Sequence, residues 1–191
     1  MKSFFGIFAV LVFATFVYAS APTHTLGQVI DELVKKTGQK SFDIENSPFG
    51  VQFDRPLSVK NGQNYLDAFQ DLLGSQGWAY EMRGPTIYIY DKKVRAMGDR
   101  HPLNRTISSL KLTNVSVKEC FKEIGKQLHL KIYAGIDNDD LSRYASTFNI
   151  ELKNITLREA IFKIVSTSGC RNWDAHTSTI DNVESLYIDM D

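Results

Sequence analysis

Apolar residues recur at helical spacing in four segments of the chain. These segments begin at Leu26, Tyr65, Val117 and Leu157, and apolar side chains then follow at intervals of three or four residues. Each segment has a hydroxyl or amide residue before it and an amide or acid three positions later, as in a capping box. These pairs are Thr25 with Gln28, Asn64 with Asp67, Ser116 with Glu119 and Thr156 with Glu159. The pattern predicts four amphipathic helices.

Short alternating segments between and after these helices predict strands, and most of them also recur in pairs. The pairs are 42–44 with 132–134, 57–59 with 150–152, and 87–89 with 186–188. A further segment, 107–112, precedes the third helix and has no clear counterpart before Thr25. The sequence therefore predicts an α+β fold of two tandem small domains of the βαββαβ type, with helices packed against small sheets.

Helix-ending residues also repeat. Gly77 and Gly169 follow the second and fourth helices, and His129 aligns with Gly38 after the third and first. Glycine takes the left-handed conformation without steric cost, and histidine tolerates it better than most residues do. We expect His129 to end a helix and not to act as a ligand or base.

The chain is expected to divide into four parts. Residues 1–21 have a basic start, an uncharged apolar stretch and small residues, which is typical of a signal peptide cleaved near 19–21; a retained anchor is the alternative. A first domain then covers 22–91 and a second covers 106–191. Lysines and arginines dominate 92–105, which is interpreted as a basic linker or, alternatively, as a contact with acidic partners.

The two copies resemble the secretin and TonB N-terminal short domain. In the second copy the likeness rests on Thr156–Ile161, Ser168–Cys170 and Leu186–Ile188. In the first it rests on 25–33, 37–38, 57–59, 65–73, 77–78 and 87–89. The resemblance implies a module that docks to other proteins, but no long β-rich region follows here to imply channel or uptake activity. It predicts a non-enzymatic periplasmic interaction module, an accessory component of an envelope secretion, pilus or TonB-type transport assembly.

Composition and motifs predict no catalytic chemistry. Basic and acidic residues number 22 each, so nucleic-acid binding is not expected. The four histidines are scattered and no glycine-rich phosphate loop occurs, so neither metal nor cofactor is predicted. Asp137–Asp140 lacks the full calcium-loop pattern and is interpreted as a connection between strands. A periplasmic small-ligand-binding protein or enzyme, and an envelope structural protein, remain open alternatives.

Asn104, Asn114 and Asn154 each begin a glycosylation-type triplet. The last two stand just before predicted helices, so we interpret them as turn residues.

The two cysteines lie in the second copy. Cys120 lies on the buried face of the third helix, and Cys170 aligns with Trp78 beyond the fourth. An exported protein favours a Cys120–Cys170 disulfide, and two buried free thiols are the alternative.

Candidate partner-binding residues lie in the last hairpin of each copy. The alternation in 87–89 and 186–188 predicts that Tyr88, Tyr90 and Tyr187 point outward, where exposed tyrosines suit docking. The second hairpin is seven residues longer, around His176 to Glu184, which predicts a recognition loop or a tolerated insertion. Open strand edges would offer backbone groups to a partner strand.

Overall fold

The structure is a computed structural model, and it describes residues 23–39, 41–45, 51–136, 147–170, 172–180 and 183–190. Its mixture of helices and strands confirms the predicted α+β class. The expected signal peptide (1–21) and the connection at Asp137–Asp140 lie outside the described residues. No helix in the described ranges is long and apolar enough to cross a membrane.

Both copies follow the same order of elements, βαββαββ. The first contains β1 (His24–Thr25), α1 (Leu26–Thr37), β2 (Ser41–Glu45), β3 (Gln52–Phe53), α2 (Tyr65–Ser75), β4 (Trp78–Arg83) and β5 (Thr86–Asp91). The second contains β6 (Thr106–Val115), α4 (Val117–Leu128), β7 (Lys131–Ile136), β8 (Phe148–Thr156), α6 (Leu157–Ser168), β9 (Trp173–Ile180) and β10 (Val183–Met190). The structure thus supplies β1 as the missing counterpart of β6.

One predicted strand is wrong. Residues 57–59 form no strand, and their place in the first copy is taken by β3, which pairs with β1. Leu57 is nevertheless buried in the first core. Its apolar character therefore reflects burial in an irregular segment, which alternation alone does not distinguish from a strand.

The predicted caps are confirmed. Thr25, Ser116 and Thr156 each form a full capping box, and Asn64 accepts from the backbone N–H of Asp67. His129 ends α4 in the left-handed region, with φ 51° and ψ 43°. Gly62, Asn114 and Asn154 each stand two residues before an N-cap with positive φ. Asn114 and Asn154 therefore serve as turn residues, as expected.

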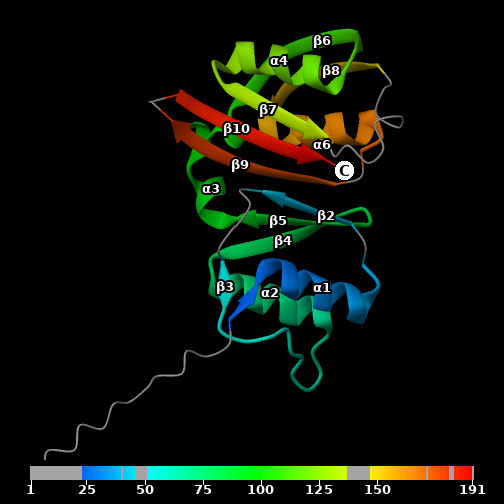
Figure 1. Cartoon of the computed structure of the whole chain (residues 1–191), viewed down its shortest axis with the longest axis vertical. Coiled ribbons are helices and arrows are strands. Elements are labelled where there is room, and N and C mark those ends of the chain that lie inside the picture. Colours follow the sequence, from blue (N-terminus) through cyan, green and yellow to red (C-terminus); the bar gives the residue numbers. More distant parts are fainter. Residues whose placement is uncertain are drawn as a thin grey trace, which may run out of the picture.

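Three strands of each copy join in one six-stranded sheet with the order β4-β5-β2-β9-β10-β7, while β1 pairs with β3 and β6 with β8 in two separate sheets. The junction is the parallel pair β2 and β9, where Ile44 is opposite Asp174 and Glu45 is opposite Ala175. Figure 1 shows the first copy at one end of this sheet and the second at the other. The two copies therefore share one continuous sheet.

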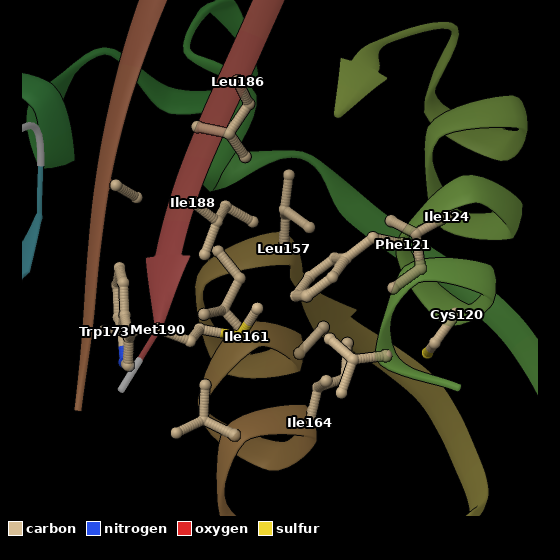
Figure 2. Close-up of a cluster of buried hydrophobic side chains, with 14 of the residues drawn as sticks. Cys120, Phe121, Ile124, Leu157, Ile161, Ile164, Trp173, Leu186, Ile188 and Met190 are labelled. Carbon is tan, nitrogen blue, oxygen red and sulfur yellow. The ribbon is translucent and has the colours of Figure 1, made fainter. Parts of the chain in front are cut away.

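Each copy packs its own pair of helices against its strands. Ile87 and Ile89 of β5 belong to the first core, with α1 and α2. Leu186 and Ile188 of β10 belong to the second core, with α4 and α6, as Figure 2 shows. Tyr88, between Ile87 and Ile89, belongs to the second core. Because neighbouring residues of a strand point to opposite faces, β5 has one copy's core on each side.

The predicted linker, 92–105, is folded. It forms α3 (Lys92–Ala96) and two short 3₁₀ turns, at 98–100 and 102–104. Val94 and Leu103 are buried, and the amide of the buried Asn104 donates to the carbonyls of Val94 and Gly98. The apolar residues of the segment are buried, while most of its basic residues are exposed to solvent. The charge pattern alone therefore predicted a linker where the structure has a folded segment.

Candidate interaction surface

A buried polar network joins the two copies at β2. Arg158, at the start of α6, donates from Nε and Nη2 to the two carboxylate oxygens of Glu45, at 2.5 and 2.7 Å. The hydroxyl of Tyr88 donates to the same carboxylate. Burial alone would lower the pKa of Arg158, but the hydrogen bonds and charge of Glu45 raise it overall. Burial, and next the charge of Glu45, raise the pKa of Tyr88.

Further hydrogen bonds close the same junction. Asp43 accepts from the backbone N–H of Trp173 at 3.0 Å. The side-chain oxygen of Asn172 accepts from the hydroxyl of Ser41 and the backbone N–H of Phe42. These hydrogen bonds favour one alignment of β2 with β9, because buried polar groups are stable only when they are hydrogen-bonded.

Tyr88 and Tyr90 do not form the exposed surface that alternation predicted. Tyr88 is fully buried, with the ring of Phe162 edge-on at 4.7 Å and that of Trp173 at 5.7 Å. Tyr90 is partly buried, and the guanidinium of Arg95 lies 3.4 Å from its ring centroid. The prediction was wrong because the outer sheet face of the first copy is covered by α6 and α3, and alternation cannot show what covers a face.

Tyr187, unlike Tyr88, is not fully buried. It is partly exposed, and its ring stacks between those of His176 and Tyr133, each 4.9 Å away between centroids. The three residues lie on one rung of β9, β10 and β7. Tyr133 has 49% of its surface exposed. The second copy therefore presents a row of three rings on the face that corresponds to the buried face of Tyr88.

The longer second hairpin is regular, so the expected recognition loop is not a loop in the described residues. His176 lies within β9 and Glu184 within β10, and residues 181–182 between these strands lie outside the described residues. Glu184 binds Arg105 at 2.5 Å and is partly buried. The extra residues lengthen two paired strands, because Thr179 and Glu184 are opposite one another.

A groove lies along β7, at the end of the sheet. It has a volume of about 850 Å³ and runs between α4 and the starts of β7 and β10. Phe121, Leu130 and Ile132 give it an apolar lining, and Lys118, Lys122, Lys126 and Lys131 surround that lining. A second hollow of about 400 Å³ continues past Tyr133 toward Tyr187 and Asp189. The two hollows share Lys118, Ile132 and Tyr133.

Sequence reasoning missed the residues of this groove. The signal was present, because Lys118, Lys122 and Lys126 follow each other at intervals of four, which places them on one helix face. What was missing was the position of β7, since only the strand order shows that this helix borders the end of the sheet.

The predicted disulfide is absent from the structure. Cys120 and Cys170 are both free and buried. The alignment behind the prediction is wrong, because Trp173 occupies the position of Trp78: Trp78 is opposite Asp91, and Trp173 is opposite Met190, the counterpart of Asp91. Cys170 instead follows the end of α6, where the Ser168 hydroxyl donates to its sulfur at 3.2 Å.

Among the described residues, no group of three or more His, Cys, Asp or Glu side chains is placed to hold a metal ion. Comparisons with family models, curated proteins and solved structures found no match for this chain.

Proposed function

We infer that this chain is a non-enzymatic protein-interaction module, exported to the periplasm as an accessory component of an envelope secretion, pilus or TonB-type transport assembly. The resemblance of both copies to the secretin and TonB N-terminal short domain supports this assignment, as does the signal-like segment 1–21. Its partners are envelope proteins, and no nucleic acid is involved.

One observation carries the proposal. The outer sheet face of the first copy is covered by α6 of the second copy and by α3, whereas the same face of the second copy leaves Tyr187 partly exposed and Tyr133 exposed. Tyr88 is 0% exposed, and Tyr133, on the corresponding rung of the second copy, is 49% exposed. Tyrosines offer a large contact area at a low entropic cost, so an uncovered row of rings suits protein docking.

Photochemical cross-linking in living cells tests this function. Tyr133 is replaced by benzoylphenylalanine, and the control carries the same group at Val59, which is 40% exposed in the first copy. We expect a discrete adduct with an envelope protein from position 133 only. The same adducts from both positions, or none from position 133, would contradict the proposal, as would reproducible turnover of a small substrate by the purified wild-type chain.

A further inference from the structure

One edge of β7, the outer strand of the second copy, is unpaired among the described strands. β7 ends the sheet and pairs, among the described strands, only with β10. An unpaired strand edge exposes backbone N–H and C=O groups that readily accept another strand, and proteins usually cover or interrupt such edges. Here the edge is bordered by the groove along β7.

In the first copy, the equivalent strand edge is paired with another strand. β2 and β7 are equivalent, because Asp43 is opposite Tyr88 and Tyr133 is opposite Tyr187 on matching rungs. The edge of β2 that corresponds to the free edge of β7 is occupied by β9, which pairs with it in parallel. The repeated unit therefore takes up a parallel strand once within this chain, and the second copy has the same edge unfilled in the described residues.

The charge beside the edge selects the kind of strand. Lys118, Lys122 and Lys131 are exposed and form no ion pair with any described residue, while Lys126 binds Glu123 at 2.6 Å. Glu184, the acidic residue of the groove, is already bound to Arg105. Acidic side chains of an added strand would meet these lysines, and its apolar side chains would meet Phe121 and Ile132.

We propose that β7 and the lysine face of α4 bind an extended acidic segment of a partner protein, which adds to the sheet as a seventh strand parallel to β7. This proposal deepens the function inferred above and rests on it. The backbone of β7 provides the hydrogen bonds, the lysines provide the charge preference, and the apolar lining takes alternate side chains.

A second copy of this chain fits the edge less well. It would have to present β4, the other end of the sheet, in the way that β9 meets β2. The junction of β9 with β2 contains the Glu45–Arg158 ion pair. The corresponding residues are Gly135 in β7 and Leu66 in α2, which cannot form an ion pair. Self-association is therefore an outcome of the test and not the proposal.

The test uses the mature chain and a fluorescein-labelled peptide of alternating valine and glutamate. The anisotropy of the labelled peptide is followed as the chain is added, which detects dissociation constants up to about 1 mM. Amide hydrogen exchange of residues 131–136 is measured in parallel. We expect binding that weakens in about 0.5 M salt, together with slower exchange in β7. A peptide with lysine in place of glutamate should not bind.

Two charge-reversed variants sharpen the result. The double substitution Lys118→Glu and Lys122→Glu should weaken peptide binding by about tenfold or more, since two charge pairs become repulsive. The matched control reverses Lys35 and Lys36, two exposed lysines at the end of α1, and should bind like the wild type. Both variants change surface charge equally, so their circular dichroism should match that of the wild type.

Several results would overturn the proposal. Absence of binding, binding without slower exchange in β7, or equal effects of the two variants would each do so. Concentration-dependent dimerisation that the Lys118 and Lys122 reversals abolish would assign the edge to a second copy. If Tyr133 still cross-links to an envelope protein while the peptide fails to protect β7, the proposed function stands and this inference fails.

Discussion

Glu45 and Arg158 are 113 positions apart in the chain and form a two-point ion pair at the junction of the two copies. The Glu45 side chain is fully buried and that of Arg158 is 10% exposed. Removing one member of such a pair leaves the other charge buried without its partner, which is strongly unfavourable. The pair therefore fixes how β9 meets β2.

Arg158→Met should destabilise the chain by about 3–5 kcal/mol, because Glu45 then loses both donors of the guanidinium. Glu45→Met should have a similar effect, since it leaves Arg158 without an acceptor. The double variant should recover part of the loss, because two apolar side chains of similar volume suit a buried site, while the buried Tyr88 hydroxyl still lacks its acceptor. Urea unfolding of the three variants measures this coupling, and additive losses would show that the pair is not the unit of stability.

Tyr88 and Tyr187 should respond differently to the same substitution. Tyr88→Ala should cost about 3–5 kcal/mol, as expected for a large buried aromatic side chain. Tyr187→Ala should cost less, because the partly exposed ring loses two aromatic pair contacts, each worth about 0.5–1.5 kcal/mol. Thermal or urea unfolding provides the measurement. Equal losses would contradict the difference in cover between the two sheet faces.

Both cysteines should be recovered as free thiols. Unfolding the chain without reductant and titrating with a thiol reagent should give two sulfhydryls per chain, because the structure holds both as free and buried. In the folded state Cys120 should resist alkylation at pH 8, since burial raises the pKa of its thiol to about 12. Finding no sulfhydryl in the unfolded, unreduced protein would instead restore the disulfide.

Local sequence signals predicted the repeated unit well. The helices, their caps and the left-handed His129 all depend on residues within a few positions of one another, so periodicity and capping chemistry are sufficient to locate them. The two-residue strand β1 was missed because it is too short to show alternation.

These local signals could not predict the candidate interaction surface. Ile87–Ile89 and Leu186–Ile188 have the same pattern, yet Tyr88 is buried and Tyr187 is partly exposed. The difference arises because Phe162 of α6 and Trp173 of β9 pack on Tyr88, more than 70 positions away in the chain. No local pattern encodes such a contact, nor the strand order that leaves β7 at the end of the sheet among the described strands.

His101 should make the chain less stable in mild acid. It is buried beside the junction of the copies, and its Nδ1 accepts from the backbone N–H of Leu103 at 3.3 Å, which requires the neutral ring. Burial lowers its pKa below the ordinary 6.5; Glu45 and Glu184 act against this shift, while Arg158 and Arg105 add to it.

Because the folded-state pKa of His101 lies below the unfolded value, the unfolded chain binds the proton first as pH falls. This contribution to stability is complete above pH 6.5 and is lost as pH falls toward the folded-state pKa. Asparagine in His101→Asn can keep the acceptor for Leu103 but does not titrate, so the variant should show a flatter dependence of unfolding free energy between pH 7 and about 5. Urea unfolding across that range gives both slopes, whatever the absolute stability of the variant. An unchanged slope would show that His101 does not set the acid sensitivity of the junction.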